Sequence, residues 1–439
     1  MDMLKETQSV CPKCLRVLPA RLVGRNEGIY LCKECPEHGP FEALIWEGDV
    51  ESWRDWDKGN TEKDSIPEAK GGSAGCPRDC GLCANHRRSG CCVLLELTRR
   101  CNLRCPVCFA SSGDNTAAQD PGLGELAAQM DWLMAHGGPF NLQLSGGEPT
   151  MRDDLPEIIR LGREKGFTFF QLNTNGLRLA SEKGYAAKLK EAGLNTVFLQ
   201  FDGLKDDIYT ALRGRPLLAE KLKAIKACAS VSLGVVLVPT VTPGVNDGEI
   251  GKLLRFAEKN MPVVRGVHFQ PISYFGRCDL PGDHGRITIP RLLREIEAQT
   301  GGKMKAADFT GGSAENPYCS IHAGYMKVGE TLRPLKKRDR AGCTTSKDSR
   351  ENVARQWSGP RLRVKAASGE TSEIPSFDDF LAQAHNDTLA ISGMLFQDAY
   401  TLDLDRLQRC YVCESDPRYG MVPFCAYNLT SDRGEGIYR

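Results

Sequence analysis

The sequence lacks three features that each define a class of protein: an excess of charge of one sign, a long apolar run and a secretory leader. Its 57 lysines and arginines are matched by 56 aspartates and glutamates in 439 residues, so charge gives no argument for a nucleic-acid partner. No segment approaches the ~20 consecutive apolar residues that a membrane span requires. The N-terminal MDMLKETQSVCPKC is polar. We therefore expect a cytoplasmic protein with no integral membrane segment.

Cysteine is the residue type in excess, with 19 in the chain. The total is odd, no export signal accompanies it, and many of the cysteines recur in pairs separated by two residues. This pattern favours metal ligation over a disulfide scaffold. The cysteines fall into groups that divide the chain, and we expect several metal centres.

The first group consists of two C-x2-C knuckles, which are Cys11-Pro-Lys-Cys14 and Cys32-Lys-Glu-Cys35. A short hairpin is predicted between them, turning at Asn26-Glu-Gly28. Four thiolates with this spacing bind one zinc or iron ion tetrahedrally, and the sequence leaves the choice of metal open. We predict a metal-bound ribbon over residues 1–58, followed by a polar, glycine-rich linker over 59–75.

Residues 93–300 alternate short β-branched runs with longer amphipathic ones, which is the pattern of βα units. The predicted strands are Val93–Thr98, Asn141–Ser145, Thr168–Asn173, Thr196–Asp202, Val231–Val238 and Val267–Ile272. The predicted helices are Gln119–His136, Asp154–Lys165, Ser181–Ala192, Leu217–Ala229, Asp247–Asn260 and Pro290–Gln299. Six such units imply an α/β fold, a parallel sheet closed fully or partly into a (β/α)6 TIM-like barrel. In such sheets the chemistry lies at the carboxyl ends of the strands.

A second cysteine pattern, C-x3-C-x2-C, follows the first of these strands and contains Cys101, Cys105 and Cys108. Three thiolates on one tight loop can bind three irons of a [4Fe–4S] cluster and leave the fourth iron open to a chelating ligand. The alternative is a zinc knuckle that takes a distant fourth ligand.

This loop resembles the signature of the radical SAM superfamily. The resemblance implies that S-adenosylmethionine (SAM) binds the open iron and is cleaved reductively, and that the resulting 5′-deoxyadenosyl radical removes hydrogen from a substrate. It also implies a low-potential electron donor of the flavodoxin or ferredoxin type as a partner.

Further motifs of this family occur at later strand ends. Ser145-Gly146-Gly147-Glu148-Pro149 is similar to the GGEP turn that approaches the methionine amino group of SAM. By the same resemblance, ribose contacts are expected from Asn173 and Asn175, further SAM-site positions from Gln200 and Asp202, and a carboxylate contact from Arg213. Arg213 could equally be a surface charge.

Two more cysteine groups predict auxiliary [4Fe–4S] clusters. The segment 76–92 contains Cys76, Cys80 and Cys83, with Cys92 or its neighbour Cys91 as the fourth ligand. The extension 301–439 contains Cys410, Cys413 and Cys425, with Cys319 preferred to Cys343 as the fourth ligand. A cluster is favoured over zinc here. Cys228 and Cys278 are typical of small core residues.

The order of all these motifs resembles the branch of the superfamily that contains archaeal tetraether lipid synthase and pterin methyltransferase-like proteins. That resemblance implies C–C bond formation or carbon-unit transfer on a lipid or pterin-like substrate. The alternatives are a peptide-maturing radical SAM enzyme and a multi-cluster electron-transfer protein. Only an enzyme would release 5′-deoxyadenosine from SAM.

Overall fold

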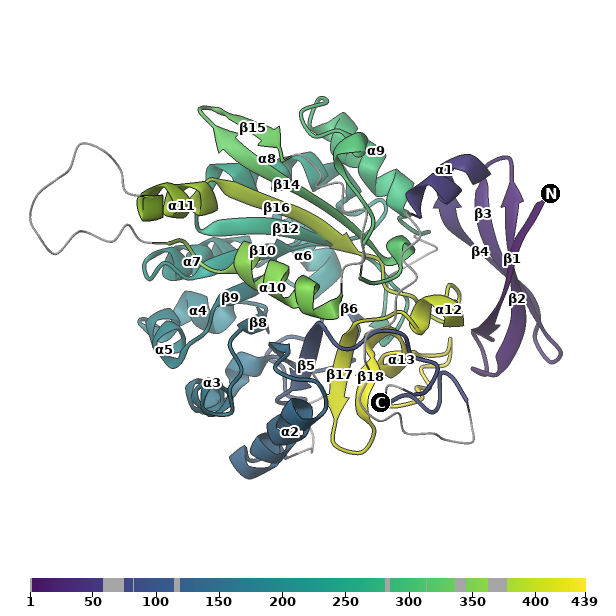
Figure 1. Cartoon of the computed structure of the whole chain (residues 1–439), viewed down its shortest axis with the longest axis horizontal. Helices are drawn as coiled ribbons and strands as arrows, with labels where there is room; N and C mark the ends of the chain where they lie inside the picture. Colours follow the sequence, from purple (N-terminus) through teal and green to yellow (C-terminus); the bar gives the residue numbers. More distant parts are fainter. Residues whose placement is uncertain are drawn as a thin grey trace, which may run out of the picture.

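The computed structural model describes residues 2–57, 75–81, 83–113, 119–280, 285–312, 314–335, 345–361 and 377–439. The predicted linker 59–75 lies outside these residues except for Gly75, and so does Cys343. Figure 1 shows a large twisted sheet with helices along its outer face and a small separate sheet at one side.

The small sheet is antiparallel and is followed by a short helix. Its strands, which lie in sequence order, are β1 (Asp2–Val10), β2 (Val17–Arg25), β3 (Gly28–Cys35) and β4 (Gly39–Glu47), and the helix is α1 (Val50–Trp56). The hairpin between β2 and β3 turns at Asn26 and Glu27, as the sequence predicts. Alternate residues of β2 are buried, which is the pattern of a strand with one face on a core.

The small sheet packs against the main body near α9 and α12, as Figure 1 shows. Trp53 of α1 stacks on Tyr318 with ring centroids 5.0 Å apart, and the Tyr318 hydroxyl donates to the Trp53 carbonyl at 2.8 Å. Lys5 Nζ also lies 2.6 Å from a carboxylate oxygen of Asp405. Aromatic stacking and an ion pair thus join the two sheets.

The main sheet contains all six predicted barrel strands, parallel and in sequence order. Its strands in sheet order are β15 (Thr331–Pro334), β14 (Ser320–Val328), β16 (Thr388–Met394), β12 (Val264–Pro271), β10 (Gly234–Val238), β9 (Thr196–Gln200), β8 (Phe170–Thr174), β7 (Asn141–Ser145), β5 (Cys92–Glu96), β17 (Val412–Asp416) and β18 (Gly420–Pro423). The prediction of a partial TIM-like barrel with an N-terminal ribbon is confirmed. The sequence did not predict that the C-terminal extension lengthens this sheet on both sides. Strand β16 pairs parallel with β12, and β17 pairs parallel with β5.

Most helices follow the predicted βα order. They are α2 (Leu123–Ala135), α3 (Leu155–Glu164), α4 (Leu177–Ser181), α5 (Tyr185–Ala192), α6 (Asp206–Arg213), α7 (Leu218–Ala229), α8 (Ile250–Lys259) and α9 (Ile289–Gln299). The predicted helix Ser181–Ala192 is wrong at its start, because α4 ends at Ser181 and α5 begins after Gly184, whose φ is +81°. Helix α6 was missed. The extension adds α10 (Ser346–Trp357), α11 (Phe377–Asn386), α12 (Leu404–Leu407) and α13 (Phe424–Tyr427).

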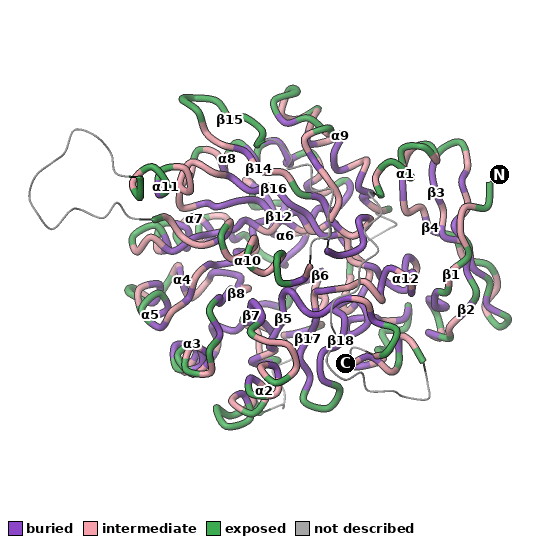
Figure 2. The backbone as a smooth tube through the Cα atoms, viewed as in Figure 1, coloured by how far each residue is buried: buried purple, intermediate pink, exposed green. Residues whose placement is uncertain are grey.

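The core lies between the sheet and these helices. Helix α8 buries Ile250, Leu253, Leu254 and Ala257, whose spacing places them on one face. Strand β10 is apolar along its length, as expected for a strand covered on both sides. Figure 2 shows burial concentrated in the main sheet and exposure on loops and outer helix faces. Within the described residues, no helix has the length and apolar character needed to cross a membrane.

We predict that Gly266→Ala destabilises the protein because a Cβ there would lie 2.2 Å from the Ala390 carbonyl oxygen, in the β12–β16 pair. Overpacking of this kind costs about 1–3 kcal/mol, so thermal unfolding should begin at a lower temperature. Gly248→Ala is the control, since a Cβ there meets no atom within 4 Å. Equal unfolding temperatures for both variants would contradict the β12–β16 pairing described above.

Candidate active site

A cavity of about 420 Å³ lies inside the barrel, lined by the radical loop and the ends of the parallel strands. Ten of the eleven residues predicted for the radical loop and SAM line it: Cys101, Cys105, Cys108, Gly146, Gly147, Glu148, Asn173, Asn175, Gln200 and Arg213. The eleventh, Asp202, is fully buried and contacts Arg213. Residues up to about a hundred positions apart therefore form one wall.

The radical loop is tied to the barrel on its outer side. Its short strand β6 (Val107–Cys108) pairs with β13 (Arg277–Cys278), and Arg277 Nε donates to the Cys105 carbonyl oxygen at 2.8 Å. Burial raises the pKa of the Cys101 thiol to about 12 and also raises that of Cys105. These thiols therefore need a nearby positive charge to ionise. Three soft thiolates lining one cavity suit an iron–sulfur cluster.

The glycine pair brings the end of β7 into direct backbone contact with the segment before the radical loop. Gly146 has a φ of +128°, and a Cβ on Gly147 would lie 2.2 Å from the Arg100 carbonyl oxygen. The Gly147 and Glu148 amides donate to the carbonyl oxygens of Thr98 and Arg100, at 2.7 and 2.8 Å. Only glycine allows this approach.

The Glu148 carboxylate is engaged by groups of the protein itself. Oε1 accepts from the hydroxyls of Thr150 and Thr174, each at 2.6 Å, and Oε2 accepts from the Asn175 amide at 2.7 Å. Asn175 Nδ2 in turn donates to Asn102 Oδ1 in the radical loop, at 2.7 Å. Glu148 thus holds the ends of β7 and β8 and the radical loop together.

Two buried cations flank the radical loop. Arg213 donates through Nε and Nη2 to both carboxylate oxygens of Asp202, each at 2.7 Å, and through Nη1 to the Val107 carbonyl oxygen at 3.1 Å. Lys221 Nζ donates to the Asn175 carbonyl oxygen at 2.6 Å. The sequence did not predict Lys221, which lies in the ordinary apolar pattern of α7. Both cations act against burial to lower the pKa of Cys105.

Another wall of the cavity combines the last barrel strand with strands of the C-terminal extension. His268, Ser392 and His322 lie in register across β12, β16 and β14, and all three line the cavity. His268 Nδ1 is 2.9 Å from Ser392 Oγ. Burial lowers the pKa of His268 to about 3, so this imidazole is neutral. The sequence could not single out this row, because β14 and β16 join the sheet only through long-range pairing.

Glu315 and an aromatic cluster complete this wall. His322 Nε2 lies 3.2 Å from Glu315 Oε1, and the Ser320 hydroxyl donates to the same oxygen. Burial alone would raise the pKa of Glu315, but the interactions with His322 and Ser320 lower it below its ordinary value. Phe198 and Trp357 stand nearby with ring centroids 4.7 Å apart. The wall is thus aromatic with one ionised carboxylate.

The predicted auxiliary ligands near residue 80 are brought together only in part. The thiols of Cys76 and Cys80 interact, and Cys83 is an electrostatic neighbour of Cys80. The Tyr438 hydroxyl accepts from the Cys80 amide at 2.9 Å. Cys92 instead lines the central cavity, with its Sγ 3.7 Å from that of Cys91. The structure therefore does not bring Cys92 to this group, because Cys92 is on the lumen side of β5.

The C-terminal cysteines form a second group. Cys319, Cys410 and Cys425 are electrostatic neighbours, and burial raises the pKa of each thiol. Cys413 is fully buried and neighbours Cys410. Arg406 Nη2 donates to Cys319 Sγ at 3.3 Å.

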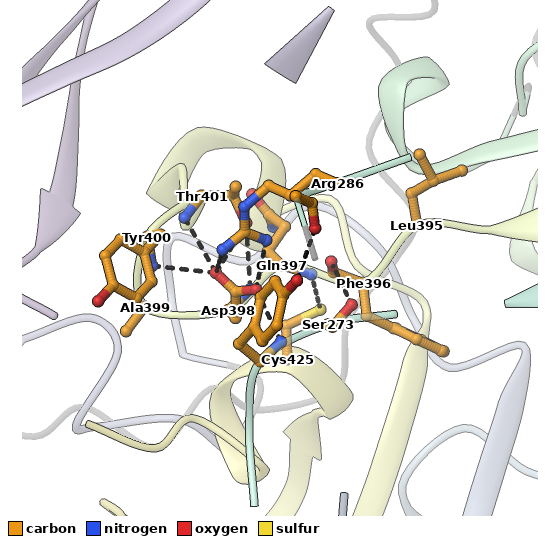
Figure 3. A network of polar contacts seen from close by, with 12 residues as sticks. Ser273, Arg286, Leu395, Phe396, Gln397, Asp398, Ala399, Tyr400, Thr401 and Cys425 are labelled. Atoms are coloured by element: carbon orange, nitrogen blue, oxygen red, sulfur yellow. Dashed lines mark hydrogen bonds and ion pairs between the residues drawn. The ribbon is translucent and has the colours of Figure 1, made fainter. Parts of the chain in front are cut away.

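Figure 3 shows how Cys425 is anchored. The Gln397 amide donates to Cys425 Sγ at 3.2 Å, and the adjacent Asp398 forms a buried ion pair with Arg286. Asp398 also accepts from the backbone amides of Tyr400 and Thr401. The loop that contacts Cys425 is therefore fixed by a charged network.

The ribbon cysteines differ from the predicted set. Ligand atoms of Cys11, Cys14, Cys35 and His38 all lie within 4.8 Å of one another. Cys32 is outside this group and has its Sγ 3.6 Å from Glu42 Oε2. Its position follows from strand geometry, because Cys32 and Cys35 are three apart on β3 and so face opposite sides. Sequence reasoning missed His38, although Cys35-Pro-Glu-His38 repeats the C-P-x pattern of Cys11-Pro-Lys-Cys14.

The chain matches the model of the radical SAM superfamily over residues 95–257 and that of the HMPTM N-terminal zinc ribbon domain over residues 3–47. It is 35% identical to the 7,8-dihydro-6-hydroxymethylpterin dimethyltransferase of Methanocaldococcus jannaschii, over 97% of this chain and 94% of that protein. It is 31% identical to the GTP 3′,8-cyclase of Paenarthrobacter nicotinovorans, over 50% of this chain and 59% of that protein.

The solved structures to which the chain is similar include Streptococcus suis SuiB bound to the precursor peptide SuiA. The TM-score is 0.42 at 14% identity, over 67% of this chain and 69% of that one. The sequence matches carry the assignment, and they confirm the resemblance stated above. This chain belongs to the radical SAM superfamily, in the family of the 7,8-dihydro-6-hydroxymethylpterin dimethyltransferase.

Proposed function

We propose that this enzyme transfers a carbon unit to a reduced pterin, using radicals made from SAM. The observation that carries the proposal is a single cavity lined by the radical loop, by an aromatic cluster and by the Glu315 carboxylate. A flat, donor-rich heterocycle suits such a cavity. The near full-length relative is named for a dihydropterin substrate, which supports the same substrate class.

Different residues that line or surround the cavity would bind the cluster, bind SAM and stabilise the radical loop. A bound [4Fe–4S] cluster would supply one electron to SAM. Cys101, Cys105 and Cys108 would hold that cluster, and the Gly146–Gly147 turn, which lines the cavity, is the proposed contact for the methionine end of SAM. Arg213 has four of its donor contacts committed to protein acceptors, so it chiefly stabilises the loop. Asn173 and Gln200 line the cavity as candidate contacts for the nucleoside.

The remaining thiols support further metal sites. Cys319, Cys410 and Cys425, with Cys413 beside them, would hold one auxiliary cluster, and Cys76, Cys80 and Cys83 would contribute to another. Buried, electrically adjacent thiols are strongly destabilising as free thiolates and suit a metal cluster. A low-potential flavodoxin or ferredoxin is the proposed electron donor, and the cytoplasm the proposed location.

We expect the cluster-loaded protein to release 5′-deoxyadenosine when dithionite, SAM and 7,8-dihydro-6-hydroxymethylpterin are added without oxygen. Cys105→Ala should abolish this product and lower bound iron by about four atoms per chain. Cys228→Ala is the matched control, because this core thiol has no thiol neighbour among its electrostatic partners. Full activity in Cys105→Ala would refute the radical loop. If a pterin deuterated on its carbons never passes deuterium to the 5′-deoxyadenosine, the substrate class is refuted.

We also expect zinc to depend on His38 and not on Cys32. Because His38 Nδ1 lies 3.5 Å from Cys11 Sγ and 3.4 Å from Cys35 Sγ, a tetrahedral Cys3His site can form without Cys32. Cys32→Ser should keep about one zinc per chain, whereas His38→Ala should lose it. Elemental analysis of both purified proteins tests this. The reverse result would restore the four-cysteine site.

A further inference from the structure

Three carboxylates line the cavity among the described residues, and two of them are committed to local structure. Glu148 is held by Thr150, Thr174 and Asn175 as described above. Asp348 accepts from the amide and the hydroxyl of Thr345 at 3.0 and 2.9 Å, which caps the start of α10. Glu315 is the third, and it is held by hydrogen bonds from β14 beside the aromatic cluster.

Glu315 is built into the wall as an ionised group. Glu315 is 5% exposed, and Ser320 and His322 both contact the same oxygen of its carboxylate, Oε1. An ionised carboxylate has about four acceptor positions, two on each oxygen. Ser320 and His322 use those of Oε1, so Oε2 is the oxygen that can accept a donor from a ligand. The Tyr411 hydroxyl also interacts with this carboxylate.

A glycine leaves the space that the Glu315 carboxylate occupies. A Cβ on Gly312 would lie 2.0 Å from Glu315 Oε1 and 2.5 Å from Oε2. Any larger residue would displace the carboxylate. The position of Glu315 is therefore fixed from two sides, by hydrogen bonds from β14 and by the close approach of Gly312.

The other groups on this wall favour a flat and uncharged ligand. Phe198, His268 and Trp357 form an aromatic cluster, with centroids of His268 and Trp357 5.8 Å apart. In the described part of the chain no lysine lines the cavity, and its single arginine, Arg213, pairs with Asp202 at the radical end. A phosphorylated substrate would find no free cation on this wall.

We propose that Glu315 is the specificity-determining residue for the substrate ring, accepting a hydrogen bond at Oε2 from the 2-amino group of a pterin. The 2-amino group projects from the pyrimidine edge of the ring, so a single carboxylate oxygen can accept from it. The aromatic cluster holds the faces of the ring. This inference rests on the proposed pterin substrate and adds the residue that recognises its ring.

The test is equilibrium dialysis of the full-length, cluster-loaded enzyme without oxygen, using two ligands. One is 7,8-dihydro-6-hydroxymethylpterin, and the other is the matching lumazine, in which an oxygen replaces the 2-amino group. Wild type should bind the pterin at least about tenfold more tightly, because the lumazine oxygen would face the carboxylate. This comparison needs no variant and so is independent of folding.

Glu315→Gln should weaken pterin binding by about 10- to 100-fold and remove most of the preference over lumazine. Gly312→Ala should have the same effect while keeping the charge of Glu315, since it displaces the carboxylate. Glu330→Gln, on the exposed turn between β14 and β15, is the matched control and should keep both affinities. Zinc and iron content per chain checks that each variant is folded.

The outcomes separate the two proposals. If wild type binds both ligands equally, or if Glu315→Gln keeps the preference for pterin, the role of Glu315 is overturned while the pterin substrate stands. If wild type releases 5′-deoxyadenosine from SAM but binds neither ligand, the pterin substrate and the role of Glu315 both fall. Loss of preference in Glu315→Gln and Gly312→Ala, with Glu330→Gln unchanged, supports the assignment.

Discussion

The ionisation of buried thiols inside the partial barrel is the constraint on which the rest of the structure depends. Burial raises the pKa of Cys101 and Cys105, so the loop needs positive charge in its surroundings. Arg213 and Lys221 provide it, and Arg213 also binds the loop through the Val107 carbonyl. A buried arginine needs a partner of its own. Asp202 fills that role and also accepts from the Thr240 amide, so the pair fixes the ends of β9 and β10 relative to the loop.

The C-terminal extension joins the substrate wall to the auxiliary thiols. Strand β14 begins directly after Cys319, β17 contains Cys413, and α13 contains Cys425. The same β14 and β16 present His322 and Ser392 to the cavity. Because these strands are hydrogen-bonded into the main sheet, a shift at the thiols would move the wall. The geometry of the two sites is therefore coupled through the backbone.

Local patterns predicted the barrel and the radical loop. Each βα unit is a short apolar run followed by an amphipathic helix, and the three thiols of the loop are eight residues or fewer apart in sequence. The features that the sequence did not predict depend on contacts between residues that are far apart in the chain. Strand β16 pairs with β12 across more than a hundred residues, and nothing local in its sequence indicates a barrel strand. The spacing of the knuckles likewise predicted Cys32 as a metal ligand. In the structure Cys32 and Cys35 lie on opposite faces of β3, and the turn after Cys35 places His38 in the group of ligands instead.

The charges around the cavity favour different positions for its two proposed ligands, SAM and the substrate ring. The cations Arg213 and Lys221 lie at the radical end, and Glu315 lies on another wall, where His268 is neutral because its pKa is about 3. Because Asp202 already neutralises Arg213, the attraction of this end for the carboxylate of a bound SAM would come chiefly from Lys221, and Glu315 would repel that carboxylate. A neutral ring with hydrogen-bond donors experiences the opposite preference. Charges that stabilise the thiolates would then also favour SAM at the radical end and a neutral ring beside Glu315.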